Sequence, residues 1–288
     1  MYIPDALPSI FSAFVILPVP QNPSHLKSLQ GGFHMDFLLH FGPSHYNDLF
    51  RCDEPYFSNR GKGDISEFVA KYKENYEKSE KKGLICIPSG NHDMDRLARS
   101  IYDNNLQISF AFLLSMPGAP FIYYGDEIGM RYVEGLASVE GGYNRTGSRS
   151  PMQWDGSTNA GFSSAPKEKL YIQMDESIDR PTAASQMADE TSLYHEIKNL
   201  INIRQSHKAL QSKGEIEFVY AEKNAYPFVY LRSVDDEQIL VILNPSSEAV
   251  SFECKYVPAE TIYSFSGEVS VDNGTITVPA HSAGYYKI

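Results

Sequence analysis

Two short segments of the chain place polar side chains directly after an apolar run. Residues 85–93 read ICIPSGNHD, where a β-branched stretch breaks at a proline and is followed by Asn91, His92 and Asp93. Residues 121–127 read FIYYGDE and end in two carboxylates. A carboxylate beside an imidazole at the end of a strand suggests acid–base or hydrogen-bonding chemistry. Asn and Asp are also common turn residues, so the segment alone fits either a reactive strand end or a turn.

The apolar pattern predicts alternating strands and helices between residues 33 and 210. Asp64 is placed to cap the first helix and Ser192 to cap the last, and both helices carry one apolar face. The segment 106–116 is apolar on all sides, which indicates a buried helix. The predicted elements are a strand at 33–39, a helix at 65–80, a strand at 84–88, a helix within 97–116, a strand at 121–124, a loop-rich stretch at 134–190 and a helix at 193–210.

The order of these elements predicts an α/β fold followed by an all-β unit. Strand–helix alternation is typical of a parallel sheet covered on both faces, and functional residues after two of its strands indicate a (β/α)8 TIM barrel. After Lys213 the sequence changes to short alternating strands that turn residues separate, which indicates an antiparallel β-sandwich. We predict an atypical N-terminal segment at 1–31, the C-terminal part of a barrel at 32–211 and a β-sandwich domain at 212–288. The predicted sandwich strands are 216–220, 228–232, 239–243, 250–254, 260–263, 274–278 and 283–288.

Composition excludes several classes of partner. The net charge of −11 and the pI of about 5.2 argue against nucleic acid or an anionic membrane as partner, and they suit a neutral ligand such as a sugar. Three scattered cysteines form neither a disulfide framework nor a zinc signature. Apolar runs are too short for a membrane span, and the apolar start lacks a preceding basic residue, which favours a cytoplasmic over a secreted protein. Most aromatic rings, Tyr123 and Tyr124 included, are expected to pack in the barrel wall rather than against a sugar.

Three segments, taken together and in order, resemble the alpha-amylase family, glycoside hydrolase family 13. They are IPSGNHD, MPGAPFIYYGDEIGM and SRSPMQWDGSTNAGFS. The resemblance implies that the first segment follows barrel strand seven and the second follows strand eight, so the chain holds about strands 5 or 6 to 8. The third segment is similar to the oligo-1,6-glucosidase and trehalose-synthase side of the family. The resemblance runs from about Gly32 to the C-terminus and implies retaining hydrolysis or transfer of α-glucosidic bonds in malto- or isomalto-oligosaccharides, starch or related glucosides.

The resemblance also assigns roles to individual residues. Asp93 matches the carboxylate that hydrogen-bonds sugar hydroxyls and stabilises the positive charge of the transition state. His92 matches an imidazole that donates to the same sugar. Asn91 belongs to the substrate-binding group by position, although the shape of the turn is its expected contribution. Arg149, in SRSPMQW, and Arg96, in NHDMDR, match arginines near the site, with surface ion pairing as the alternative for both.

Two further carboxylates of the family pattern are missing. A retaining glycosidase needs a nucleophile and a protonated acid about 5 Å apart. The family's G-x-R-x-D block does not occur, and Val19 stands where the glutamate acid is expected. We therefore expect an enzyme by descent that is inactive alone, and the alternative is a non-catalytic carbohydrate-binding or assembly module. No cofactor is expected, because calcium serves some members but its usual ligand loops are not recognisable here; a complementary half-barrel or a second copy is a partner that no motif supports.

Overall fold

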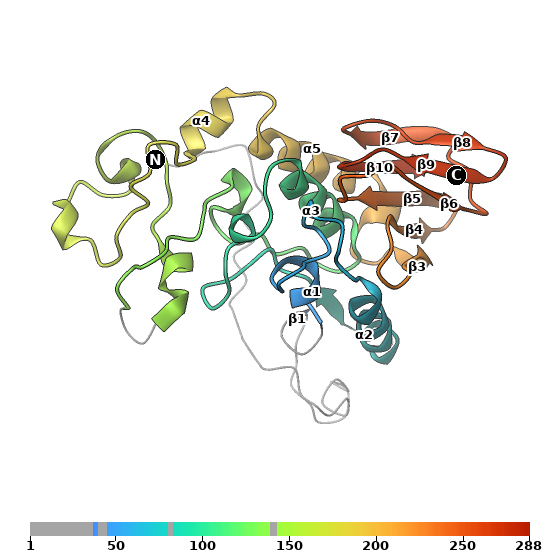
Figure 1. Cartoon of the computed structure of the whole chain (residues 1–288), viewed down its shortest axis with the longest axis horizontal. Coiled ribbons are helices and arrows are strands. Elements are labelled where there is room, and N and C mark those ends of the chain that lie inside the picture. Colours follow the sequence, from blue (N-terminus) through green and yellow to red (C-terminus); the bar gives the residue numbers. More distant parts are fainter. Residues whose placement is uncertain (1–36, 40–44, 80–82, 139–142) are drawn as a thin grey trace.

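The computed structural model of the chain describes residues 37–39, 45–79, 83–138 and 143–288. The predicted N-terminal segment at 1–31 and the first residues of the strand at 33–39 lie outside the described residues. Figure 1 shows the α/β elements in the middle of the molecule, the loop-rich stretch at one end and the antiparallel strands at the other. The loop-rich stretch and the antiparallel strands therefore lie on opposite sides of the α/β elements.

The strand that precedes the Asn-His-Asp motif belongs to a parallel pair. Strand β1 (Phe37–Leu39) pairs with β2 (Leu84–Cys86), so that Leu38 lies opposite Ile85. The chain between them forms α1 (Asn47–Phe50) and α2 (Ser66–Lys78). The N-cap of α2 is Ile65, one residue after the predicted Asp64, but the Asp64 side chain still accepts a hydrogen bond from the backbone N–H of Ser66 at 2.8 Å. This is the strand–helix–strand unit that the sequence predicts.

The predicted strand at 121–124 is wrong in extent. The structure has a single parallel bridge between Pro88 and Phe121, and the Ser89 N–H donates to the Phe121 carbonyl at 2.8 Å. The next ladder bond is replaced, because the N–H of Tyr123 donates to the Ser89 hydroxyl at 2.9 Å instead of to a backbone carbonyl. A hydroxyl side chain at the strand end thus takes over a bond that a longer strand would have made.

The remaining helices follow the prediction with shifted boundaries. Helix α3 (Asn104–Ser115) is buried along most of its length, as its uniformly apolar sequence indicates. Helix α5 (Leu193–Ser206) begins after Ser192, whose hydroxyl accepts from the N–H of His195. Helix α4 (Ala183–Ala188) lies within the predicted loop-rich stretch. Short 3₁₀ turns are found at Leu97–Arg99, Asp126–Ile128, Tyr143–Arg149, Thr158–Gly161, Lys167–Lys169 and Lys208–Leu210.

The C-terminal strands form two antiparallel sheets. Their bounds are β3 (Glu215–Tyr220), β4 (Phe228–Val234), β5 (Glu237–Asn244), β6 (Val250–Glu253), β7 (Glu260–Phe265), β8 (Ser270–Asp272), β9 (Thr275–Val278) and β10 (Ser282–Lys287). One sheet has the order β3-β4-β5-β10-β7 and the other β6-β9-β8. The seven predicted strands are all found, and β8 was not predicted.

The inner strands of the five-stranded sheet, β4, β5 and β10, are buried on both faces. Alternate residues of β4 divide between two cores: Phe228 and Tyr230 join the core around α3, while Val229 and Leu231 face the three-stranded sheet. This double burial explains why β4 and β5 are almost continuously apolar. The helix and the sheet also share hydrogen bonds, since the Tyr285 hydroxyl donates to the Ala111 carbonyl of α3 at 2.6 Å. The α/β part and one face of the five-stranded sheet therefore share one core.

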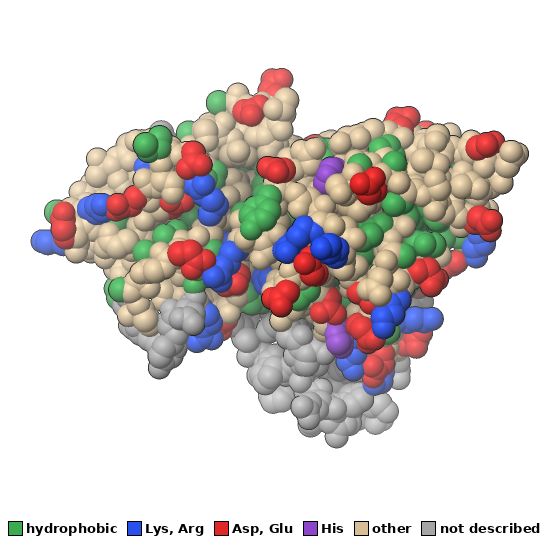
Figure 2. All heavy atoms as spheres, viewed as in Figure 1, with side chains coloured by type: hydrophobic (Ala, Val, Ile, Leu, Met, Phe, Trp, Pro, Cys, Tyr) green, Lys and Arg blue, Asp and Glu red, His purple; other side chains and the backbone are tan. Residues whose placement is uncertain are grey.

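The described surface carries both signs of charge. On the face in Figure 2, Lys and Arg groups lie among Asp and Glu groups instead of forming a separate basic patch. No helix in the described part of the chain combines the length and the apolar character that a membrane span needs.

Candidate functional site

Asp93 lies in a tight turn that directly follows the parallel strand pair. The Asn91 side-chain oxygen accepts from the backbone N–H of Asp93 at 2.8 Å, and its amide lies 3.1 Å from the sulfur of Met94. Asn91 is buried, with 7% of its surface exposed, whereas 37% of the Asp93 side chain is exposed. Asn91 therefore shapes the turn and Asp93 is the group that the turn presents to solvent.

Two arginines converge on one oxygen of this carboxylate. Nη2 of Arg149 lies 3.0 Å from Oδ1 of Asp93, and Nη1 of Arg145 lies 3.1 Å from the same atom. The other oxygen, Oδ2, lies 3.5 Å from Nε2 of His92. Arg149 also donates through Nε to the His92 carbonyl at 2.9 Å, which fixes its guanidinium against the turn. A carboxylate oriented in this way can accept hydrogen bonds from a hydroxylated ligand and offer negative charge to a developing cation.

The structure brings Asp93, His92 and Arg149 together, and Arg145 is the residue that the sequence analysis missed. Both arginines belong to the 3₁₀ turn Tyr143–Arg149. Residues three apart share a face in a 3₁₀ helix, so the i, i+4 spacing of the two arginines gave no signal of a shared face. No motif pointed to Arg145, because it lies just before the segment SRSPMQWDGSTNAGFS, which includes Arg149.

Arg96 lies away from this group and is buried. Its Nη1 donates to the Tyr124 carbonyl at 2.7 Å and lies 3.2 Å from Oδ1 of Asp126, and its guanidinium packs 4.8 Å from the Tyr124 ring centre. Asp126 also accepts from the Ser89 hydroxyl at 2.7 Å. Burial raises the pKa of Asp126, and the positive charge of Arg96 opposes that rise. The pair links the ends of two predicted barrel strands, so Arg96 supports the site and does not reach its surface.

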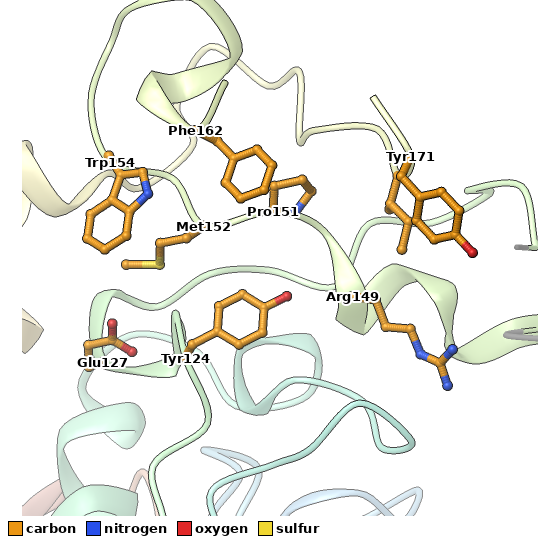
Figure 3. A pocket seen from close by; sticks show the side chains of 9 residues that line it. Tyr124, Glu127, Arg149, Pro151, Met152, Trp154, Phe162 and Tyr171 are labelled. Carbon is orange, nitrogen blue, oxygen red and sulfur yellow. The ribbon is translucent and has the colours of Figure 1, made fainter. Parts of the chain in front are cut away.

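A pocket of about 430 Å³ lies beside the carboxylate. Figure 3 shows Tyr124 on one side, Phe162 and Pro151 opposite, Trp154 and Met152 at one end, and Tyr171 and Arg149 at the other. Tyr124 has 39% of its surface exposed, so the prediction that it packs in the barrel wall is wrong for this ring.

Glu127 is the carboxyl group of the pocket. Its Oε2 is buried and has no hydrogen-bond partner among the described residues. Burial raises the pKa of Glu127, and backbone N–H groups of Glu127 and Gly125 oppose the rise. A carboxyl group whose protonated form is favoured can donate a hydrogen bond as well as accept one.

The described residues were compared with the ligand sets that bind metal ions. Within the described ranges, His, Cys, Asp and Glu side chains form no group of three or more that could hold a metal ion. Cys52, Cys86 and Cys254 are all free thiols.

Residues 35–213 match the family model "Alpha amylase, catalytic domain". The chain is 27% identical over 235 residues to the oligo-1,6-glucosidase of Parageobacillus thermoglucosidasius, a match that covers 69% of the chain and 40% of that protein. It is 31% identical over 166 residues to the amino acid transporter heavy chain SLC3A1 of Homo sapiens, covering 54% of the chain and 22% of that protein.

The structure is similar to that of a mutant of the trehalulose synthase MutB. The TM-score is 0.65 at 26% identity, and the match covers 78% of the chain and 46% of the MutB chain. The chain therefore spans less than half the length of each of these three proteins.

Proposed function

Since the chain belongs to the alpha-amylase catalytic-domain family, we propose that it is the C-terminal portion of an enzyme that hydrolyses or transfers α-glucosidic bonds with retention of configuration. In this proposal residues 32–211 correspond to about strands 5 or 6 to 8 of a (β/α)8 barrel, and residues 212–288 form its C-terminal β-sandwich domain. The parallel pairing of β1 with β2, followed by the bridge from Pro88 to Phe121, supports the barrel assignment.

The observation that carries the proposal is the carboxylate of Asp93, held by Arg145 and Arg149 in the turn after β2. Cleavage of a glucoside develops positive charge on the sugar ring, and a fixed negative charge lowers the energy of that state. Asp93 would stabilise this charge and accept hydrogen bonds from ring hydroxyls, while His92 would donate to the same sugar. Arg149 would orient the carboxylate and contact the substrate.

No recognisable block of this sequence supplies the other two carboxylates, the nucleophile and the general acid. Retaining cleavage requires both a nucleophile and an acid, and Asp93 in the proposed role replaces neither. The 288-residue chain alone is therefore expected to bind glucosides without cleaving them. Its partner in this proposal is an oligosaccharide or another α-glucoside, and no cofactor is required.

A second function is favoured by one comparison. The human relative is named as a transporter heavy chain and not as a glycosidase. A non-catalytic binding or assembly module derived from the family would also lack the two carboxylates. This alternative includes a carbohydrate-binding module and an assembly module, and only the assembly module differs from the first proposal in giving Asp93 no role in sugar binding.

Binding of maltose and isomaltose, measured by isothermal titration calorimetry, tests the proposal. Asp93→Asn keeps the shape but removes a charged acceptor worth about 1.5–3 kcal/mol, so we expect binding to weaken by at least about tenfold. Asp95→Asn is the matched control, because Asp95 is similarly exposed, at 35%, but pairs with Arg99. Equal affinity of the parent chain and Asp93→Asn would refute the role of Asp93 and favour the assembly module.

An assay for glucose released from maltose, isomaltose, sucrose or starch tests the catalytic part. We expect no release by the chain alone. Release that Asp93→Asn abolishes would show that the chain holds a complete site and would overturn the assignment of missing carboxylates.

A further inference from the structure

The turn that presents Asp93 is bound at both ends by one guanidinium group. Arg51 follows α1, and its Nη2 donates to the Ser89 carbonyl at 2.5 Å. Its Nε donates to the Asp95 carbonyl at 2.7 Å. Residues 89–95 contain Asp93, so the two carbonyls mark the start and the end of the segment that carries the carboxylate. Because the guanidinium is planar and rigid, binding both carbonyls fixes the two ends of the turn relative to each other.

Arg51 is itself held in place. Its Nη1 donates to the hydroxyl of Tyr46 at 3.0 Å, and this hydroxyl in turn donates to the Pro88 carbonyl. Tyr46 is fully buried, and the Arg51 guanidinium lies 5.3 Å from the centre of its ring. A Cβ built on Gly90 would lie 3.3 Å from Nη2 of Arg51, so the turn passes directly against the guanidinium. A donor supported in this way can keep the ends of the turn in one position.

Donors from a second segment bind the middle of the turn. The Ser148 hydroxyl donates to the Met94 carbonyl at 2.6 Å, and Nε of Arg149 donates to the His92 carbonyl at 2.9 Å. Both donors belong to the 3₁₀ turn that also contains the second arginine of the site. Arg51 comes from the segment before β2 and binds the two ends, so the turn is held between two separate parts of the chain.

We propose that Arg51 is a positioning residue for the Asp93 site. By binding both ends of the turn it sets the direction in which the carboxylate points, and through that direction it sets the affinity for a glucoside. Hydrogen bonds weaken steeply when donor and acceptor are misaligned, and a binding group must be held within about 0.5 Å of its productive position. The inference rests on the proposed function, because it takes Asp93 as the group that contacts the sugar. It adds a residue from outside the motif that acts through the backbone of the turn.

A role in stability alone is the alternative for Arg51. In that case its loss would destabilise the whole chain and leave the geometry of the folded site unchanged. The two roles differ in amide hydrogen exchange, because global opening exposes the helices and the turn alike, whereas local opening exposes the turn alone.

Two variants, titrated with maltose and isomaltose in a calorimeter, test the positioning role. Arg51→Met removes every donor, and we expect both sugars to bind about tenfold more weakly than they bind the parent chain. Arg51→Lys keeps the charge but offers one nitrogen in place of the fork, so it can hold one end of the turn and should bind with intermediate affinity. Arg60→Met is the matched control, because Arg60 lies in the same connection between β1 and β2 but pairs with Glu54. Its affinity should equal that of the parent.

Hydrogen exchange followed by NMR gives the readout that separates the two roles. The backbone N–H of Asp93 donates to the Asn91 side chain within the turn, and its exchange should become about tenfold faster in Arg51→Met. The amides of α3, which is buried along most of its length, should exchange as they do in the parent.

The outcomes separate this inference from the proposed function. If Asp93→Asn loses sugar binding but both Arg51 variants bind as the parent does, the proposed function stands and the positioning role is overturned. If affinity falls in Arg51→Met while exchange in α3 accelerates by the same factor as exchange at Asp93, the effect is one of stability and the positioning role is again overturned. If the parent chain binds neither sugar, the proposed function fails and this inference fails with it. Weaker binding together with faster exchange in the turn alone supports the positioning role.

Discussion

Arg232 offers a severe test of how the helices and the sheet are held together. It lies on β4 with no exposed surface, and its guanidinium donates to the carbonyls of Ser115, Gln211, Gly214 and Glu215. These acceptors belong to the end of α3, to the turn before β3 and to β3 itself. One side chain therefore satisfies carbonyl groups from two separate segments, the end of α3 and residues 211–215.

Replacing this residue by Met keeps much of the volume and removes all donors. The bonds to the Ser115 and Gly214 carbonyls are buried, and losing each donor costs about 1.5 kcal/mol; the part-buried bonds to Gln211 and Glu215 add about 0.5 kcal/mol each, which gives about 4 kcal/mol. Removing a buried charge returns part of that cost, so we expect a net loss of about 3 kcal/mol in the free energy of unfolding. This is a large share of the roughly 5–15 kcal/mol that stabilises a typical domain.

The assay is urea unfolding of the Arg232→Met variant, followed by far-ultraviolet circular dichroism and by the fluorescence of Trp154. Arg60→Met is the control, since Arg60 is half exposed and pairs with Glu54 at 3.4 Å. The control should lie within about 0.5 kcal/mol of the parent. A loss of less than about 1 kcal/mol in Arg232→Met would refute the reasoning, because the four carbonyls would then be satisfied in another way.

Three further predictions concern smaller groups. Ser89→Ala removes the donor to Asp126 and the acceptor for Tyr123, and thermal unfolding should show a loss of about 1–3 kcal/mol; an unchanged midpoint would contradict the bridging role. The raised pKa of Glu127 favours proton binding by the folded state, so stability should fall as pH rises from 4.5, the ordinary value, through the raised pKa. Glu127→Gln should remove that fall in urea unfolding at a series of pH values, and an identical pH profile would count against it. Glu237 has a lowered pKa: burial raises it, but the Ala209 N–H and His207 outweigh that effect. Its stabilisation should be present above pH 4.5 and lost as pH falls through the lowered value, and Glu237→Gln should lack this acid-side loss.

Local patterns were sufficient to predict most of the fold. Strands β4 and β5 are buried on both faces, so each appears in the sequence as a continuous apolar run that predicts a strand. The uniformly apolar sequence of α3 likewise predicted a buried helix. Strand β8 was missed because all three of its residues are exposed and give no alternation. The strand at 121–124 was overextended because the apolar run says nothing about which backbone group finds a partner.

The site was predictable only where its residues lie in the segments that carry the family resemblance, which include Arg149. Asn91, His92 and Asp93 form one motif, and their turn follows from their types. The contact of Arg145 with Asp93 and the pocket beside Arg149 both depend on the position of residues 143–172 relative to the strand ends. No short sequence pattern predicts that position. Arg96 was assigned to substrate binding because it follows Asn91, His92 and Asp93 closely in the sequence. Its side chain instead lies in the interior, where it contacts the Tyr124 carbonyl and Asp126.

The arrangement around Asp93 has little value for folding. Asp93 is 37% exposed and Arg145 is 45% exposed, and exposed ion pairs contribute about 0–1 kcal/mol each to stability. Two guanidinium groups nevertheless meet at one carboxylate oxygen, and all three side chains come from the described part of the chain. Stability alone gives little reason for two arginines to pair with the same oxygen. In the proposed role, both arginines orient the negative charge of Asp93 toward a ligand. Asp93 and its two arginines meet within this chain, so binding measured on this chain is a direct test of the role proposed for Asp93.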